Sequence, residues 1–441
     1  MSSDNLPAPE KEHSLGSNFH KLWAGQAISA LGNSFTGFAL PLLVYELTQS
    51  ALNLAYSAAA HFVPYLLFGL FIGAWSDRVD RRRLMIWTDI GRAAAIATVP
   101  LLATLGALEV WWIYAVIFIN SILSIAFDAA NFAAVPSLVD RDDLVTANGR
   151  IQASYSAMTI LGPLLAGAVV AVLPIYDLLL IDSFSFVLST ITLVLIRASF
   201  NAPGKPHGTS IRQDVMEGLR YVFGHPVLRN ISLMMMLVNF AGITVYTQRV
   251  LYVKEQLGGT DSELAVFMAA GGAGVILFSL LAGRLRKRFP FSRVALGALM
   301  GSGAATVVMA FTSWYWLALP AYALFSGLGL MFNINTSSLR QAIAPNYMLG
   351  RVMSIAGVLA WSANPLGAYV GGLAIERTQN VGLVFAVVGL VTIVIPVCFA
   401  FTALGRAEQY LPGKDEPAAP EPDLVPAAPQ ERHITTPLNA G

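Results

Sequence analysis

The sequence predicts an all-α membrane protein in which twelve transmembrane helices form two pseudo-symmetric six-helix bundles. The chain has 441 residues, of which 56% are hydrophobic and only 12% are charged. A soluble domain typically carries about twice that share of charged residues. The apolar residues form long blocks, of the length that a helix needs to cross a bilayer. We expect helices and not a β-barrel, because a barrel would need short alternating segments and the chain shows none.

Twelve spanning segments can be placed along the chain, six in each half. The first six are 20–47, 52–75, 84–106, 110–138, 147–173 and 176–197. The second six are 227–253, 261–283, 291–312, 315–340, 350–375 and 380–404. The chain therefore divides into an N-terminal tail at 1–18, a bundle at 19–198, a linker at 199–226, a second bundle at 227–404 and a C-terminal tail at 405–441. The C-terminal tail is rich in Pro, Ala and Glu, and we expect it to be disordered.

The linker contains one amphipathic stretch. Ile211, Val215, Leu219 and Val222 recur at helical spacing, and charged residues occupy the other faces. This pattern predicts a surface helix. It would lie against the cytoplasmic side of the membrane or act as a tether between the bundles.

Basic residues indicate how the chain is oriented. If both termini are cytoplasmic, the outer loops hold only Lys254 and Arg377. The inner loops then hold Arg78, Arg81, Arg82, Arg83, Arg141, Arg150, Arg197, Arg284, Arg286, Lys287, Arg288, Arg293 and Arg351. Because loops rich in Lys and Arg stay inside, we expect a multi-pass protein of the cytoplasmic membrane with both termini in the cytoplasm.

The most charged short loop lies between the second and third segments, at 73–83. It resembles the signature loop between helices 2 and 3 of the major facilitator superfamily, Gly-x-x-x-Asp-Arg-x-Gly-Arg-Arg. The matching residues are Gly73, Asp77, Arg78, Arg81 and Arg82. Asp80 replaces the usual second glycine, a change common in the branch that resembles macrolide-efflux and enterobactin-export proteins. The resemblance covers about residues 19–404.

The resemblance implies a conformational lock formed by these five matching residues. Asp77 would meet the N-terminus of the eleventh segment when the inner side is closed, since a carboxylate is stabilised by the positive end of a helix dipole and its free N–H groups. Arg78 and Arg81 would add ion pairs. The alternative is that the loop serves only as a topology signal.

Four segments carry a single polar stripe, and each is the first helix of a three-helix repeat. We expect their side chains to line a cavity, since a polar face on an apolar helix turns toward protein or water. The resemblance likewise implies that helices 1, 4, 7 and 10 line the central cavity. For any one stripe, hydrogen bonding between helices is the alternative. The expected lining residues are Gln26, Ser29, Asn33, Thr36, Asn120, Ser124, Asn131, Asn239, Tyr246, Arg249, Asn333 and Ser337.

Asp128 is the first candidate for proton coupling. It shares the stripe of the fourth segment and lies roughly 10–15 Å deep at 1.5 Å per residue. A carboxylate in such a partly dry setting can exchange protons near neutral pH. Two alternatives stay open: an ion pair with Arg249 or another helix, and a helix-to-helix hydrogen bond with no role in transport.

His61 and Asp182 are the other two coupling candidates. His61 could carry a proton near neutral pH, although such a histidine is more often neutral and hydrogen-bonded. Asp182 is buried in the sixth segment, so it must be paired or protonated. Relatives in the same branch often have an acid where this chain has Asn33, which cannot titrate. Asp89 and Arg92 are spaced to pair with each other or with the signature loop.

The stretch Gly162-Pro163-Leu164-Leu165-Ala166-Gly167 resembles the antiporter motif of the superfamily. Its key residues are Gly162, Pro163 and Gly167, whereas Ser154 replaces an earlier glycine of that motif. The match favours an exporter, and an ordinary packing kink is the alternative.

These features together predict a secondary active transporter that exports a hydrophobic or amphipathic small molecule. The resemblance suggests a macrolide-like drug or a siderophore, and hence an antibiotic-resistance role. Energy would come from proton antiport, because the chain has no nucleotide-binding Gly-rich Lys loop. An importer or a lysophospholipid flippase of the same fold is the alternative. An enzyme would need clustered catalytic residues, and a sensor would need a folded soluble domain, and the chain shows neither.

Composition limits the partners. The net charge of +1 gives no sign of nucleic-acid binding. The single cysteine, Cys398, excludes a disulfide framework and a multi-cysteine metal site. We expect a monomer whose partners are the small-molecule substrate, protons and the lipid bilayer, with no cofactor and no metal.

Overall fold

The computed structural model describes residues 15–76, 78–140, 143–198, 200, 211–345 and 348–410. Within these ranges the secondary structure is helical, and twelve helical spans are long and apolar enough to cross a membrane. The predicted fold class is confirmed. The first bundle consists of α1 (Ser17–Thr48), α2 (Ala51–Ser76), α3 (Arg81–Thr104), α4 (Val110–Ala134), α5 (Leu144–Val170) and α6 (Ile175–Val194). A 3-10 turn, η1 (Val135–Ser137), extends α4.

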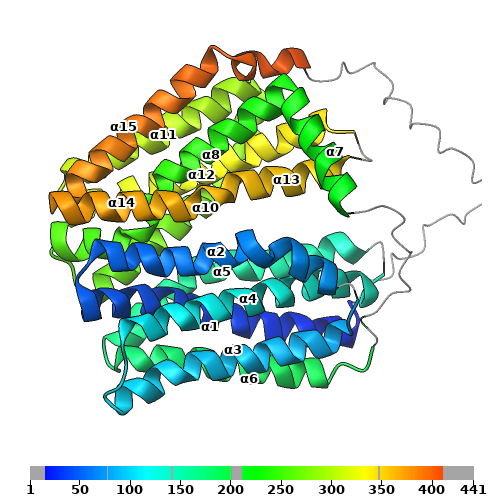
Figure 1. The fold of residues 1–441 in the computed structure, drawn as a ribbon, viewed down its shortest axis with the longest axis vertical. Helices are drawn as coiled ribbons and strands as arrows, with labels where there is room; N and C mark the ends of the chain where they lie inside the picture. The colour runs from blue at the N-terminus through cyan, green and yellow to red at the C-terminus, as the bar shows by residue number, and fades with distance from the viewer. Residues whose placement is uncertain are drawn as a thin grey trace, which may run out of the picture.

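The second bundle follows the linker helix α7 (Ile211–Gly224). Its helices are α8 (Pro226–Thr247), α9 (Arg249–Leu251), the π-helix η3 (Tyr252–Gln256), α10 (Asp261–Arg288), α11 (Phe291–Phe311), α12 (Tyr315–Ile343), α13 (Leu349–Ser362), α14 (Asn364–Thr378) and α15 (Val381–Ala400). The two bundles lie one above the other in Figure 1. The first and last described residues lie at the same end, together with α7. We name this the terminal end, and the opposite one the far end.

Local sequence signals set several helix boundaries. The Asp80 side chain accepts a hydrogen bond from the Arg83 backbone N–H at 2.8 Å and caps α3. Thr260 and Glu263 form a reciprocal capping box at the start of α10. Each cap satisfies backbone N–H groups that the first helical turn leaves without partners. The charged and polar residues between the apolar blocks therefore act as helix starts.

Two predicted segments are interrupted helices. The segment 227–253 is interrupted at Gln248, whose ψ of 9° is not helical. This residue ends α8, and α9 begins at the next one. The segment 350–375 divides at Ala363 into α13 and α14, and Pro365 stands in the first turn of α14. Proline lacks the N–H that would continue the hydrogen-bond ladder, which is consistent with a break here, although Pro41 and Pro163 lie inside uninterrupted helices. The break at 248 directs the following residue, Arg249, toward the space between the bundles.

The linker and the tail are attached to the second bundle more closely than expected. On α7, Val222 is buried and packs with Met348, Val352 and Ile355 at the start of α13. Residues 405–410, predicted as the start of a disordered tail, belong to the 3-10 helix η4 (Ala403–Tyr410). Glu408 holds η4 in place, because its carboxylate accepts hydrogen bonds from the Ser292 backbone and hydroxyl, both at 2.9 Å. Residues 411–441, and 1–14 at the other terminus, lie outside the described part of the chain.

Candidate functional site

A cavity of about 730 Å³ lies between the two bundles. The first bundle contributes residues of α1 and α5, and the second bundle contributes most of the wall through α8, α10 and α12. Most of the surface is apolar or aromatic, and amide and hydroxyl groups interrupt it. Among the described lining residues, Arg249 is the single charged one. A mainly apolar pocket with a few fixed polar groups is typical of small-molecule sites.

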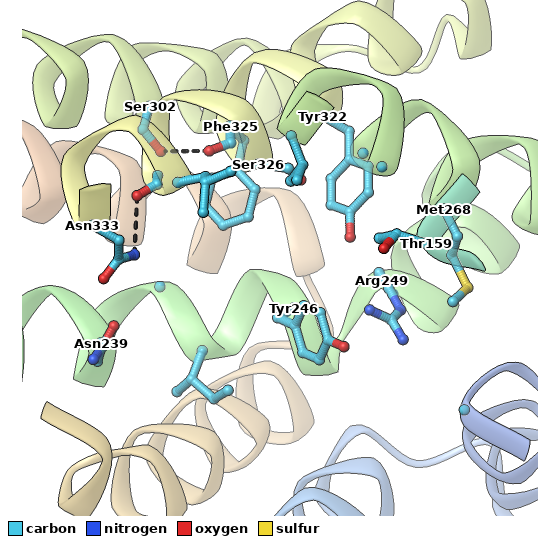
Figure 2. Close-up of a pocket in the computed structure, with 18 of the residues that line it drawn as sticks. Thr159, Asn239, Tyr246, Arg249, Met268, Ser302, Tyr322, Phe325, Ser326 and Asn333 are labelled. Carbon is cyan, nitrogen blue, oxygen red and sulfur yellow. Dashed lines mark hydrogen bonds between the residues drawn. The ribbon is translucent and has the colours of Figure 1, made fainter. Parts of the chain in front are cut away.

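The wall from the second bundle holds its polar groups by local hydrogen bonds. Asn239 on α8 donates to the Ala360 carbonyl at 2.8 Å, and Asn333 on α12 donates to the Gly329 carbonyl at 3.0 Å. Ser302 on α11 donates to the Phe325 carbonyl at 3.2 Å, as Figure 2 shows. Each side chain therefore enters the cavity in a defined orientation.

Arg249 lies between two tyrosines. Its guanidinium carbon lies 4.1 Å from the centroid of the Tyr246 ring, a distance typical of a cation–π contact. The hydroxyl of Tyr322 points toward it from α12 in Figure 2. Arg249 is only 7% exposed, yet it lines the cavity. The guanidinium is therefore largely desolvated and faces the space between the bundles.

The wall from the first bundle consists of one face of α1 and one face of α5. Asn33 and Ser34 lie on α1, and the Ser34 hydroxyl donates to the Met158 carbonyl of α5 at 3.2 Å. The two helices approach closely at Gly162, where an added Cβ would lie 2.2 Å from the Ser34 Cβ. Pro163, the next residue of the antiporter-like stretch, lines the cavity.

A separate polar cluster lies inside the first bundle around Arg92. Its guanidinium donates to Asn120 at 3.0 Å and to Asn33 at 2.6 Å, and it lies 4.1 Å from the centroid of the Phe186 ring. Three carboxylates interact electrostatically with it: Asp89, Asp128 and Asp182. One cation thus faces three groups that can each carry a negative charge.

The three carboxylates of this cluster differ in their surroundings. Asp182 has no exposed surface and accepts hydrogen bonds from Thr36 and Ser185. Asp89 is also fully buried, and neither of its oxygens has a hydrogen bond of ordinary geometry among the described residues. Asp128 is exposed and interacts with tyrosines of α2 and α5 as well as with Arg92. Asp128 is therefore the one carboxylate of the cluster that keeps exposed surface, whereas the other two are fully buried.

The hydrogen bonds that join the two bundles within the described residues lie at the far end. The carboxylate of Glu376, near the end of α14, accepts from the Ser50 hydroxyl at 3.0 Å and from the Leu52 backbone N–H at 3.4 Å. Gln248 donates to the Ala51 carbonyl at 2.8 Å. These contacts place a carboxylate and an amide at the N-terminus of α2. The far end is therefore held shut by polar contacts.

Comparison with known proteins settles the family. A family profile described as transmembrane secretion effector matches residues 15–424. The chain belongs to this family. The chain is 26% identical to macrolide efflux protein A of Streptococcus pyogenes over 374 residues, which is 83% of this chain and 92% of that protein. It is 27% identical over 356 residues to the multidrug efflux pump Tap of Mycolicibacterium fortuitum, covering 77% and 85% of the two chains.

Solved structures agree with this assignment at the level of the fold. A bacterial homologue of the iron transporter ferroportin, in an inward-facing state, matches with a TM-score of 0.69 at 18% identity, over 88% of this chain and all of that one. The expected resemblance to major facilitator efflux transporters is confirmed. The protein is therefore a transporter and not an enzyme.

Five of the twelve expected lining residues reach the cavity: Asn33, Asn239, Tyr246, Arg249 and Asn333. On α1, Ser29 is buried and Thr36 donates to Asp182 on α6. These two residues were placed at the cavity by the sequence pattern, and the structure corrects that placement. They lie seven positions apart, on the side of α1 that packs against α6, because Gly25 and Gly32 on the same side let the helices meet.

The remaining expected lining residues lie away from the cavity. None of the α4 residues is among its lining residues, so the fourth helix serves the Arg92 cluster instead. Asn120 binds Arg92, and Ser124 is half-buried. The buried Oδ1 of Asn131 has no hydrogen-bond partner among the described groups. Gln26 on α1 is buried, and Ser337 on α12 lies half-buried beyond the lining face.

The structure also shows the surroundings of His61 and of the antiporter-like stretch. His61 on α2 lies 3.1 Å from the Ser121 hydroxyl of α4, so its ring is hydrogen-bonded. Gly167 faces the second bundle, where an added Cβ would lie 2.3 Å from the Cβ of Ala265 on α10. The antiporter-like stretch therefore packs against α1 at Gly162 and against α10 at Gly167.

The predicted lock is described only in part, since Asp77 lies outside the described residues. Arg81 donates to the carbonyls of Ala133 and Phe200 at 3.2 and 3.1 Å. Arg82 donates to the Leu193 carbonyl at 2.9 Å. These partners all belong to the first half of the chain. Gly73 and Arg78 lie in and just after the last turn of α2, and Arg78 is exposed.

Sequence reasoning missed the lining residues of α5 and α10. Tyr155, Thr159 and Pro163 line the cavity from α5 at spacings of four residues, and Gly271 and Gly272 line it from α10. The spacing on α5 was a usable signal, because positions four apart share a helix face. Glycines add no polar residue to a helix face, so the sequence pattern did not indicate that α10 lines the cavity.

Proposed function

We propose that this protein exports an amphipathic small molecule from the cytoplasm by alternating access, driven by proton entry. The cavity between the bundles is the observation that carries the proposal. It is large enough for a drug-sized molecule, mainly apolar and held shut at the far end. Relatives named as a macrolide efflux protein and a multidrug efflux pump support export and an amphipathic or macrolide-like substrate.

We assign the terminal end to the cytoplasm. The loops predicted on that side carry almost all of the basic loop residues, and positive loops remain inside. The conformation described here would then receive substrate from the cytoplasm. Closing the terminal end would require the lock residues to turn from their partners in the first half toward the start of α13. Asp77 and Arg78 are the residues we propose to make that contact.

Proton coupling is assigned to the Arg92 cluster. If Asp89, Asp128 and Asp182 were all ionised, one guanidinium would face three negative charges in a poorly solvated interior. Such a surplus is costly, so bound protons are expected to offset it. Asp128 is the exposed member and therefore the entry point for protons. Asn33 receives a hydrogen bond from Arg92 and also lines the cavity, which links the cluster to the substrate.

Transport direction tests the proposal. Cells lacking the gene and cells expressing it are loaded with a fluorescent amphipathic compound, and intracellular fluorescence is followed after glucose is added. We expect the expressing cells to lose the compound faster, and a protonophore to abolish the difference. Faster accumulation in expressing cells would show an importer. Export that persists with the protonophore would remove proton coupling and leave the exporter in place.

A further inference from the structure

We propose that Arg249 binds an anionic group of the transported molecule, so that the cavity selects amphipathic acids. The inference rests on the proposed export function and names the substrate class. The structural basis is a buried guanidinium that faces the substrate cavity and, among the residues that the structure describes, has no carboxylate beside it. A charge inside a membrane protein is expensive unless it is paired, and it usually marks a substrate or ion site.

The charge balance around Arg249 is the first argument. The groups that interact electrostatically with it are Tyr246 and Tyr322, both neutral hydroxyl-bearing side chains. The described acidic residues nearest in sequence are engaged elsewhere. Glu255 contacts Tyr45, Asp261 pairs with Lys254, and Glu263 caps α10. The three aspartates of the first bundle gather around Arg92.

The geometry is the second argument. Gln248 is fully buried and hydrogen-bonded to the Ala51 carbonyl across the bundles, which fixes the backbone just before Arg249. The Tyr246 ring covers one face of the guanidinium, and the hydroxyls of Tyr246 and Tyr322 accept at its edge, which has five N–H donors in all. That edge carries N–H donors in a planar fork, which suits a carboxylate, sulfonate or phosphate. The tyrosine hydroxyls could donate further hydrogen bonds to the same anion.

The rest of the cavity supplies the apolar half of the substrate site. Met268, Phe325 and Leu330 line the same space without charge. A molecule with an apolar body and one anionic head would place its body against these side chains and its head on Arg249. The anion would also neutralise Arg249, so binding would remove the cost of an unpaired buried cation. A cationic amphiphile would instead meet an unfavourable charge.

A matched pair of probes tests the inference. We would measure binding of 11-(dansylamino)undecanoate and of its primary carboxamide to the full-length protein in lipid nanodiscs, with empty nanodiscs as the partition blank. The two probes share one skeleton and differ in the charged head. We expect the wild type to bind the carboxylate at least about tenfold more tightly than the amide, the ratio a charge-assisted hydrogen bond typically supplies.

Variants identify the residue. Arg249→Gln is expected to weaken carboxylate binding to the amide level and to leave amide binding unchanged. Arg249→Lys keeps the charge without the planar fork, so it should retain part of the preference. The matched control is Arg284→Gln, which removes an exposed charge from the terminal part of α10 and should not alter the ratio. Thermal unfolding of each variant checks that it is folded.

Several outcomes would overturn the inference. Equal binding of the two probes by the wild type would do so, as would a carboxylate preference that survives in Arg249→Gln. If Arg249→Gln does not fold, the other variants decide. A carboxylate preference in Arg249→Lys equal to that of the wild type, together with an unchanged preference in Arg284→Gln, would count against the planar fork. Tighter binding of the amide than of the carboxylate by the wild type would reject the site. Export of the neutral amide by cells would keep the proposed function even then, whereas export of neither probe would remove both.

Discussion

The carboxylate of Asp128 differs from its two companions in one property, access to water. Asp89 and Asp182 are completely buried, whereas Asp128 is exposed beside Arg92. Among the three carboxylates, Asp128 is thus the one that could exchange a proton without first being uncovered by the protein. Asn33 cannot titrate, so the proposed proton coupling is assigned to the Arg92 cluster and not to this position.

Replacing Asp128 with Asn keeps the shape and removes the titrating group. We expect Asp128→Asn to insert and fold normally, to lose pH-gradient-driven efflux by about tenfold or more, and to keep downhill movement of substrate. Proteoliposomes with an imposed pH gradient provide the measurement. Ser124→Ala, one turn earlier on α4, is the control and should transport like the wild type. Uphill efflux at the wild-type rate in Asp128→Asn would exclude this residue and move the role to Asp182 or His61.

At the scale of single helices, glycine decides how closely the spans approach one another. On α10, a Cβ added at Gly274 would lie 2.0 Å from the Ala323 carbonyl oxygen of α12. On α12, a Cβ added at Gly327 would lie 2.5 Å from the Gly274 carbonyl oxygen. The two backbones are thus in direct contact at this crossing. Small residues at such crossings allow the close packing that holds transmembrane helices together.

Gly274→Ala tests this crossing. The new methyl group would collide with backbone, which cannot rotate away as a side chain can. We expect a loss of about 1–3 kcal/mol of stability, the usual range for overpacking. The measurement is thermal unfolding in detergent. The control is Gly297→Ala on α11, where an added Cβ has no neighbour within 4 Å. Equal unfolding temperatures for the two variants would show that α10 and α12 separate without cost.

At the scale of the whole molecule, the contact at the far end resembles the lock predicted for the terminal end. Glu376 near the end of α14 contacts the start of α2 across the two bundles. The predicted lock would bring Asp77, at the end of α2, to the start of α13. Each contact sets a carboxylate against the positive end of a helix dipole. We therefore expect the two contacts to alternate, one closing the far end and the other the terminal end.

Glu376→Gln is expected to weaken the far-end contact and to shift the protein toward the outward-open state. Charge–dipole interactions of this kind contribute typically about 0.3–2 kcal/mol, which is enough to bias two nearly balanced states. Gly242→Cys in a Cys398→Ala background reports the shift, because position 242 lines the cavity and has open space beside it. Labelling by an impermeant maleimide added outside should speed up in Glu376→Gln.

The control for this experiment is Arg377→Gln, which changes the neighbouring exposed charge and should leave the labelling rate unchanged. Unchanged labelling in Glu376→Gln would mean that the carboxylate does not hold the far end. Unchanged labelling in both variants, together with normal transport, would assign closure to the packing of α5 on α10 and of α2 on α14.

The sequence by itself determined the class of protein and the positions of its spans. Three local features carry this information: apolar blocks of bilayer length, basic loops on one side and the signature loop. Membrane insertion depends directly on the hydropathy and charge of each segment. These features required no knowledge of which helix packs against which.

Tertiary structure decided which neighbour covers each polar face. The periodicity of α1 indicates a polar stripe, but only packing shows that Thr36 turns to Asp182 while Asn33 turns to Arg92 and the cavity. The gathering of three carboxylates around Arg92 joins three helices, and no spacing within one helix predicts it. Arg249 was placed at the cavity from its sequence stripe, yet only the fold shows that no carboxylate of the described ranges lies beside it. Helical spacing fixes directions around one axis, whereas the rotation of each helix against its neighbours is set by close packing.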